Sequence, residues 1–357
     1  MKTARRVVKE EVFPLKNHRK FLAAVASIAA IASLTACGGV KDANTASGSA
    51  ITIGTTDKIT SVDPAGSYDN GSYAVQIQIF PFLYAQDYNT SELSPDIAAD
   101  DGTWNDDGTE FTVKIKEGLK FANGHDLPAS DVKFSYDRIK TINDANGPSS
   151  LLANVESVEA PDDTTVVFKD SVPFDVTLKQ VMSSPAGPIV DEEVFDADKL
   201  TDADTIVKGN AFAGPYKLTA FKMNETASYE KNDSYKGLTP AKNDAIQVKY
   251  FADASNLKLN VQQGQIDVAF RSLTPTDIED LSKDSKVKVV KGPGGEERFL
   301  TFNFKIQPYG ESQSDADANK AKAVRQAVAN LIDRDELSEK VYKGTYTPMY
   351  SFIPDGL

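Results

Sequence analysis

The side chains that most often carry out acid–base or nucleophilic catalysis are rare in this sequence. Among its 357 residues there are two histidines, His18 and His125, and one cysteine, Cys37. Serine-type hydrolysis needs an imidazole beside the nucleophile, yet the sequence has neither a Gly-x-Ser-x-Gly motif nor a phosphate-binding Gly-x-x-x-x-Gly-Lys-Ser/Thr motif. His125 lies in the turn-rich stretch FANGHDLPAS and is interpreted as a surface histidine. Because one histidine and one cysteine do not make a zinc site, we expect no metal and no cofactor.

Carboxylates are the one abundant group of reactive side chains, with 52 aspartates and glutamates. Paired carboxylates hydrolyse glycosides, so a secreted carboxylate-dependent glycosidase stays open as an alternative, although abundance alone does not favour it. The acidic residues at 100–101 and 106–107 lack the alternation and the closing glutamate of a calcium-binding loop. We interpret them as two solvated turns.

The single cysteine follows a leader that is typical of exported proteins. Six basic residues between positions 5 and 20 precede an uncharged, alanine-rich run at 21–34, whose 14 residues are too few to span a bilayer. The stretch Leu34-Thr35-Ala36-Cys37 resembles the lipobox of bacterial lipoproteins. This resemblance implies a signal peptide at 1–36 and a lipid on Cys37, the first residue of the mature protein. A signal anchor and a buried structural thiol are the alternatives.

The charge of the chain excludes several kinds of partner. The formal net charge is −13, and without the seven basic and two acidic residues of the leader it becomes −18. Such an acidic surface argues against nucleic acid and against electrostatic docking on anionic lipids. Attachment to a membrane would therefore depend on the lipid anchor, which holds stably with two acyl chains.

The first half of the mature chain contains both helical and strand patterns. Residues 37–50 are rich in Gly, Ser and Ala and predict a flexible tether. A strand is expected at 51–54 and a helix at 74–83, ending near Pro81. Further on, the sequence predicts a hairpin turn at 105–108, a strand at 111–115, a helix capped by the Ser130 hydroxyl, and a turn followed by a strand at 161–170.

The second half repeats this mixture and includes a glycine-rich break. We expect a helix at 255–263 that ends at Gly264, followed by a strand at 266–270. The stretch KGPGGEE at 291–297 predicts a hinge, because glycines leave the backbone free. Beyond it the sequence predicts a strand at 299–304, an amphipathic helix around 324–331, and a second helix that is capped by Asp333 or Asp335 and ends near Gly344.

Five stretches of the mature chain resemble the extracellular solute-binding proteins, family 5, which serve ABC importers for oligopeptides, dipeptides and nickel chelates. They are ITIGTTDKITSVDPAGS, ELSPDIAADDGTWNDDGTEFTVKIKEGLKFANGHDLPASDVKFSYDRI, FAGPYKL, QQGQIDVAF and LTFNFKIQP followed by KAVRQAVANLIDRDEL. The resemblance implies an α/β fold of the periplasmic-binding-protein type II, with two lobes. Lobe one would comprise residues 51–80 and 205–290, with an inserted subdomain at 81–204. Residues 291–357 would form the start of lobe two. Family members are longer, so we expect that this chain is truncated early in lobe two.

The same resemblance implies a binding function and no enzymatic activity. The protein would capture a di- or oligopeptide between its lobes and deliver it to the permease and ATPase of an ABC importer. It would act as a monomer, anchored by its lipid on the extracytoplasmic side of the cell membrane, either in the periplasm or on the outer face of a Gram-positive membrane. A different solute, such as a nickel chelate or an oligosaccharide, and a surface adhesin or signalling lipoprotein are the alternatives.

The resemblance also implies a set of ligand-binding residues. The loop after Asp63-Pro64 contributes Tyr68, Asp69 and Asn70, and the end of the strand that follows GQID contributes Phe270 and Arg271. Three further positions lie on the strand beside the hinge, namely Glu296, Arg298 and Thr301. A bound peptide needs one charged partner for each terminus, so Arg271 is expected to pair with a carboxylate and Glu296 with an ammonium group. The alternative is that these are ordinary solvated loop residues.

Overall fold

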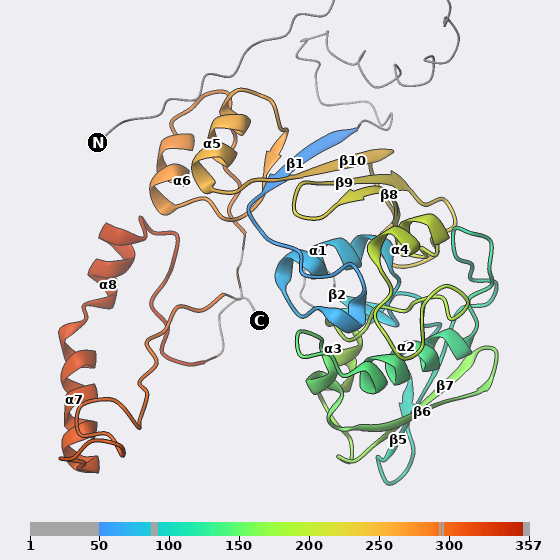
Figure 1. Cartoon of the computed structure of the whole chain (residues 1–357), viewed down its shortest axis with the longest axis horizontal. Coiled ribbons are helices and arrows are strands. Elements are labelled where there is room, and N and C mark those ends of the chain that lie inside the picture. Colours follow the sequence, from blue (N-terminus) through green and yellow to red (C-terminus); the bar gives the residue numbers. More distant parts are fainter. Residues whose placement is uncertain (1–49, 87–91, 293, 295, 353–357) are drawn as a thin grey trace, which may run out of the picture. The chain divides into compact units, whose positions relative to one another are not determined.

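The computed structural model describes residues 50–86, 92–292, 294 and 296–352 (Figure 1). The predicted signal peptide, the lipidation at Cys37 and nearly all of the predicted tether lie outside these residues. Positions 293 and 295 of the predicted hinge lie outside them as well. Within the described ranges, no helix combines the length and the apolar character that a membrane span requires.

A five-stranded sheet forms the part of the fold that contains the first strand. Its order is β11-β1-β10-β9-β8, and β1 runs parallel to both of its neighbours, whereas β9 is antiparallel to β10 and to β8. The prediction of a strand at 51–54 is confirmed, while the strand expected at 266–270 is reduced to two residues. The strands are β1 (Ile51–Thr55), β8 (Tyr216–Lys222), β9 (Thr226–Lys231), β10 (Ala245–Tyr250) and β11 (Val268–Ala269).

The helices α1 (Asn70–Ile79) and α4 (Ala203–Gly209) pack against β8. Buried apolar side chains fill this core, including Phe80 and Phe212, whose ring centroids lie 6.3 Å apart. Helix α1 ends before Pro81, as predicted, but it begins four residues earlier than expected because the carboxylate of Asp69 caps it. The same part of the chain contains η1 (Pro64–Gly66), α5 (Ala254–Gln262) and α6 (Pro275–Leu281).

A second, antiparallel sheet is formed by residues that lie between β1 and β8 in the sequence. Its order is β4-β5-β7-β6, and α2 (Ala129–Ile142) packs against β6 and β7. The core between them includes Tyr136 and Phe168, which meet edge to face at 5.0 Å. The predicted turn at 105–108 is confirmed between β4 (Thr103–Trp104) and β5 (Glu110–Lys114). The remaining elements are β6 (Val155–Asp162), β7 (Thr165–Asp170), the pair β2 (Tyr84–Gln86) and β3 (Leu93–Pro95), η2 (Ser149–Leu152) and α3 (Leu178–Met182).

The prediction that Ser130 caps α2 is wrong. The helix starts at Ala129 with Pro128 at its N-cap position, so Ser130 already lies inside the first turn. Its hydroxyl instead donates a hydrogen bond to Glu192 Oε1 at 2.8 Å. Proline is common near helix starts because the missing N–H is not needed there, and this signal overrides the serine.

The described residues after 296 form helices and no strand. They comprise α7 (Ala318–Leu331), α8 (Arg334–Glu336) and a π-helical turn, η3 (Leu337–Val341). Asp333 caps α8 by accepting the Glu336 N–H at 2.9 Å, as predicted. The strand expected at 299–304 is absent from the described residues, and Phe299 and Leu300 are 70% and 66% exposed. A strand is stable only beside a partner, and none of the described strands pairs with this segment.

The backbone of α1 approaches the preceding loop so closely that only glycine fits at position 71. A β-carbon on Gly71 would lie 2.1 Å from the carbonyl oxygen of Lys58. We therefore expect Gly71→Ala to lower the free energy of unfolding by about 1–3 kcal/mol, despite the better helix propensity of alanine. Urea unfolding of both proteins measures the difference. Gly292→Ala is the matched control because its β-carbon would meet nothing within 4 Å, and equal midpoints for the two variants would contradict the prediction.

Candidate functional site

The carboxyl ends of the three parallel strands β1, β10 and β11 meet at one edge of the five-stranded sheet. Backbone hydrogen bonds continue past the strands, from Phe251 N–H to the Thr55 carbonyl at 2.8 Å and from Phe270 N–H to the Gly54 carbonyl at 2.8 Å. In open α/β sheets, ligands bind beyond the carboxyl ends of strands. The loops after these three strands are therefore the expected location of a ligand site.

Arg271 follows β11 and projects from a constrained backbone. Arg271 and Ser272 both adopt left-handed backbone conformations, with φ of 61° and 58°. Residues other than glycine seldom adopt such conformations. The Arg271 guanidinium lies between two carboxylates. Its Nε is 4.0 Å from Asp57 Oδ2 after β1, and its Nη2 is 3.8 Å from Glu296 Oε2. Strained residues of this kind are often found at functional sites.

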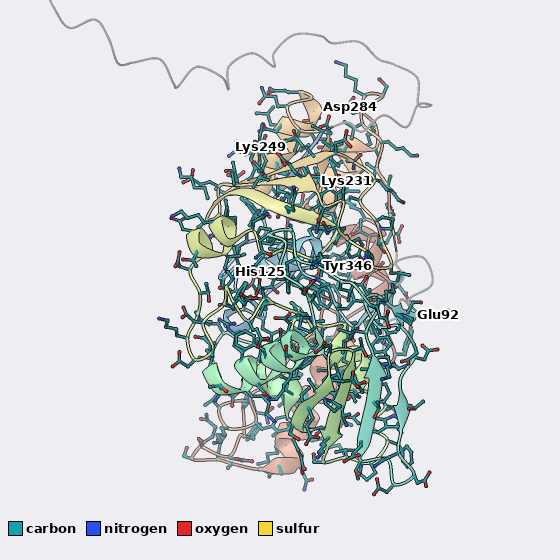
Figure 2. All side chains as sticks on the ribbon, turned by 90° about the vertical axis from the view of Figure 1, so that its right-hand side faces the viewer. Glu92, His125, Lys231, Lys249, Asp284 and Tyr346 are labelled. Atoms are coloured by element: carbon teal, nitrogen blue, oxygen red, sulfur yellow. The ribbon has the colours of Figure 1, made fainter. Side chains whose placement is uncertain are left out.

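A second arginine completes a chain of alternating charges. Arg298 Nη2 lies 2.5 Å from Glu296 Oε1, and its Nε donates to the Tyr346 hydroxyl at 3.3 Å. The Tyr346 side chain is labelled in Figure 2. The bond to Tyr346 and the charge of Glu296 raise the pKa of Arg298. We call Asp57, Arg271, Glu296 and Arg298 the sheet-edge cluster, and it holds equal numbers of positive and negative groups.

Two residues near this edge were not predicted from the sequence. Asp57 is one, and Tyr250 at the end of β10 is the other. Burial first, and the charge of Asp57 to a smaller extent, raise the pKa of Tyr250 to about 12. Asp57 lies two residues after the end of β1, and Tyr250 is the last residue of β10. A position at the end of a strand is the signal that could have identified them.

The loop before α1 does not join the sheet-edge cluster. Asp69 accepts the N–H and the hydroxyl of Ser72, both at 2.8 Å, and also the hydroxyl of Thr60. Its carboxylate is therefore engaged in capping α1. Tyr68 and Asn70 are exposed, and in the described part of the chain no hydrogen bond or ion pair links Tyr68, Asp69 or Asn70 to the cluster.

The remaining predicted site residues are open to solvent. Phe270 is 48% exposed beside Arg271, and Thr301 is exposed. The structure thus brings together Arg271, Glu296 and Arg298 of the predicted set. A cavity of about 360 Å³ lies elsewhere, beside the four-stranded sheet, and its lining includes Trp104 and Phe111 but none of the predicted site residues.

Comparisons with known proteins identify the family. Residues 92–357 match the model of the bacterial extracellular solute-binding proteins, family 5 Middle. The probable D,D-dipeptide-binding periplasmic protein DdpA of Escherichia coli is 26% identical over 300 residues, which cover 83% of this chain and 55% of DdpA. The dipeptide-binding protein DppE of Bacillus subtilis is 28% identical over 270 residues, which cover 70% of this chain and 46% of DppE. The chain thus spans about half the length of these curated relatives.

Solved structures show the same fold. The periplasmic binding protein DppA of Helicobacter pylori, in complex with the peptide STSA, matches with a TM-score of 0.70 and 20% identity, over 86% of this chain and 61% of DppA. The substrate-binding protein CtaP of Listeria monocytogenes matches with a TM-score of 0.68 and 25% identity, over 86% of this chain and 60% of CtaP. These neighbours are type II periplasmic binding proteins, so the predicted α/β fold class is confirmed. The chain belongs to family 5 of the bacterial extracellular solute-binding proteins.

Proposed function

We propose that this chain is the substrate-binding lipoprotein of an ABC importer and that it captures a di- or oligopeptide for delivery to the membrane permease. The observation that supports this most directly is the position of Arg271, at the carboxyl ends of parallel strands and beside Asp57 and Glu296. A guanidinium there can bind a peptide carboxylate, and the nearby carboxylates can attract the ammonium group. Nothing in this arrangement requires chemistry on the ligand.

The ligands named for structural neighbours support the same chemistry. They include the peptide STSA, the dipeptide Met-Leu, a nonapeptide, Ni(L-His) and Fe(III)-EDTA. All of these molecules contain carboxylate groups, although only some of them are peptides. The carboxylate is therefore the group that we assign to Arg271, and peptides are the most frequent ligand class among the named examples.

For Glu296 we propose a role other than the ammonium binding that the family resemblance implied. Both of its carboxylate oxygens already face guanidinium groups, at 3.8 Å from Arg271 and 2.5 Å from Arg298. We infer that Glu296 holds Arg271 while the site is empty and that a ligand carboxylate competes with it. Recognition of the ligand ammonium then falls to Asp57, whose side chain is 18% exposed.

Calorimetric titration with Ala-Leu and with its C-terminally amidated form tests this proposal. We expect Arg271→Gln to weaken binding of Ala-Leu at least about 10-fold, which is ~1.4 kcal/mol, and to leave the amide almost unaffected. Lys222→Gln is the charge-matched control, because Lys222 pairs with Glu225 at 2.5 Å outside the cluster. Glu296→Gln should strengthen binding of Ala-Leu if Glu296 competes with the ligand, and should weaken it if Glu296 binds the ammonium group.

Two results would contradict the proposal. If none of a panel of di- to pentapeptides binds or raises the melting temperature, peptides are not the ligand. Binding of a nickel–histidine chelate in the same assay would then identify metal chelates as the ligand class. If peptides bind but Arg271→Gln and Lys222→Gln behave alike, the function stands and the assignment of Arg271 is wrong.

The anchoring and closure of the protein complete the proposal. We infer that Cys37 carries the lipid, that the protein acts as a monomer on the extracytoplasmic side of the membrane, and that lobe one comprises 51–80 and 205–290 with the insertion at 81–204. The division of the chain between its two main sheets is compatible with these boundaries. Ligand binding would shift an equilibrium between open and closed lobes, and the permease would recognise the closed state.

A further inference from the structure

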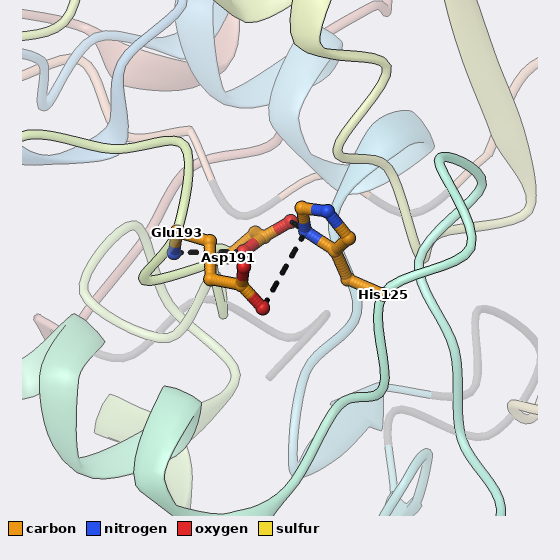
Figure 3. Close-up of side chains that lie close together, drawn as sticks. All are labelled: His125, Asp191 and Glu193. Atoms are coloured by element: carbon orange, nitrogen blue, oxygen red, sulfur yellow. Dashed lines mark hydrogen bonds and ion pairs between the residues drawn. The ribbon is translucent and has the colours of Figure 1, made fainter.

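A group of one histidine and two carboxylates lies away from the sheet-edge cluster. His125, in the loop before α2, meets Asp191 and Glu193 from the segment before α4 (Figure 3). His125 Nδ1 lies 2.7 Å from Asp191 Oδ2 and 3.9 Å from Glu193 Oε1. One donor atom from each residue lies within 4.8 Å of the other two. We call these three residues the His125 cluster. The expectation of a plain surface histidine is therefore incomplete, because the ring faces two carboxylates.

Neighbouring groups hold this arrangement in place. Asn123 Nδ2 donates to Asp191 Oδ2 at 2.9 Å, and Asn123 Oδ1 accepts the N–H of His125 at 3.0 Å. The N–H of Glu193 donates to Asp191 Oδ1 at 2.9 Å. The Asp191 side chain is 2% exposed, whereas His125 and Glu193 are 37% and 70% exposed. The cluster thus has an ordered, buried carboxylate on one side and access to solvent on the other.

The surroundings carry more negative charge than the protein compensates. Asp131 and Glu192 lie beside the cluster, since the Glu192 N–H donates to Asp131 Oδ1 at 2.8 Å. Among the described residues, no lysine or arginine forms an ion pair with Asp131, Asp191, Glu192 or Glu193, and the one ion-pair partner is His125, which faces Asp191 and Glu193. Asp131 and Asp191 are buried, and buried carboxylates without a permanent cation are costly.

Two titratable side chains at this place have raised pKa values, Asp131 chiefly through burial and His125 chiefly through its hydrogen bond with Asp191. Burial first, and then the charges of Glu192, Asp191 and Glu193, raise the pKa of Asp131 to about 8 against the effect of its backbone hydrogen bond. The hydrogen bond with Asp191 raises the pKa of His125.

The donor set favours a transition-metal ion over calcium or magnesium. An imidazole nitrogen with two carboxylates suits Zn²⁺ and similar ions, whereas Ca²⁺ and Mg²⁺ prefer oxygen donors alone. Ligands at Zn–N and Zn–O distances of about 2.1 Å in a tetrahedron lie about 3.4 Å from one another. The two distances from His125 Nδ1, 2.7 Å and 3.9 Å, bracket this value, and all three donor atoms lie within 4.8 Å of one another, so side-chain adjustment would have to bring them into place around an ion.

We propose that His125 Nδ1, Asp191 Oδ2 and Glu193 Oε1 bind one divalent transition-metal ion of the Zn²⁺ class, with water completing its coordination. The ligands bind such an ion in their deprotonated forms, so binding strengthens as the pH rises. The ion also links the loop at 121–126 to the segment at 191–193 and stabilises the fold on binding. The metal site is separate from the sheet-edge cluster and does not depend on the proposed transport function.

Titration of the metal-free full chain with Zn²⁺ tests the proposal. Cys37→Ser serves as the reference protein, because the Cys37 thiol is itself a zinc ligand. We expect one ion per chain at pH 7.5, at least 10-fold weaker binding in His125→Gln and in Glu193→Gln, and weaker binding of the reference at pH 6. Glu156→Gln, an exposed glutamate on β6, is the control and should bind like the reference.

Two outcomes would overturn the site. Equal zinc affinity in His125→Gln and the reference would place the ion elsewhere, and failure of the reference to bind at pH 7.5 would exclude the site. Glu193→Gln keeps the experiment decisive if His125→Gln does not fold, because Glu193 is largely exposed and its removal leaves the His125–Asp191 contact intact. With Co²⁺ in the unmodified chain, a thiolate charge-transfer band would reveal binding at Cys37 instead.

Discussion

Replacing Arg138 by methionine is expected to lower the free energy of unfolding by about 3–5 kcal/mol. Arg138 lies on α2 with its side chain 2% exposed, and its Nη1 and Nη2 donate to the two carboxylate oxygens of Asp63 at 2.7 and 2.6 Å. It also donates to the carbonyl oxygens of Asp196 and Lys199, at 2.5 and 2.9 Å. Methionine leaves the fully buried Asp63 carboxylate without its counter-charge and two carbonyls without a donor.

Urea unfolding of Arg138→Met at pH 7 measures this loss. The matched control is Lys133→Met on the same helix, because Lys133 pairs with Asp137 on a half-exposed face and should cost less than about 1 kcal/mol. Adding Asp63→Asn to Arg138→Met should recover part of the loss, since Asp63→Asn removes the isolated negative charge. If Arg138→Met and Lys133→Met unfold at the same urea concentration, the buried pair does not stabilise the fold as argued.

Asp131→Asn is expected to make the metal-free protein more stable at alkaline pH and to leave it unchanged near pH 4. The pKa of Asp131 is raised from 3.8 to about 8 in the folded protein, so the native state binds more protons than the unfolded state between these values. The free energy of unfolding therefore falls as the pH rises from about 4 to about 8. Asparagine keeps the acceptor for the Glu192 N–H without the charge, and a shift of this size corresponds to a gain of roughly 5 kcal/mol at pH 8.

Urea unfolding in the presence of a chelator at pH 4.5, 6 and 8 follows this effect. Asp106→Asn is the control because Asp106 is exposed, and its unfolding should track the unchanged protein at every pH. A constant difference between Asp131→Asn and the unchanged protein across the three pH values would show that Asp131 titrates normally.

Local signals in the sequence were sufficient for much of the fold. The turn at 105–108, the end of α1 before Pro81 and the cap at Asp333 depend on residues close in sequence, and all three are confirmed. The early start of α1 had a local signal too, because Asp69 precedes Ser72 by the spacing of an N-cap. The expected strand at 299–304 failed for a different reason: a strand requires a neighbour, and local sequence does not supply one.

The candidate site was harder to predict because it is assembled from distant segments. Asp57 and Arg271 are more than 200 residues apart and meet because β1 and β11 are parallel neighbours. The resemblance to the family pointed to Arg271, Glu296 and Arg298, which do come together. It could not show that Asp69 caps a helix or that both oxygens of Glu296 already face arginines, since these facts depend on side-chain geometry.

The central position of β1 affects how the protein is made on the ribosome. Thr55 is the last residue of β1, and its partner Tyr250 is translated 195 residues later. At about 5–20 residues per second, β1 waits roughly 10–40 s with both of its edges unpaired. The four-stranded sheet needs only residues 103–170 and can form while β10 and β11 are still unmade. The nascent chain thus carries an unpaired strand edge until β10 has been made, and the five-stranded sheet beside the proposed solute-binding residues can form only after that point.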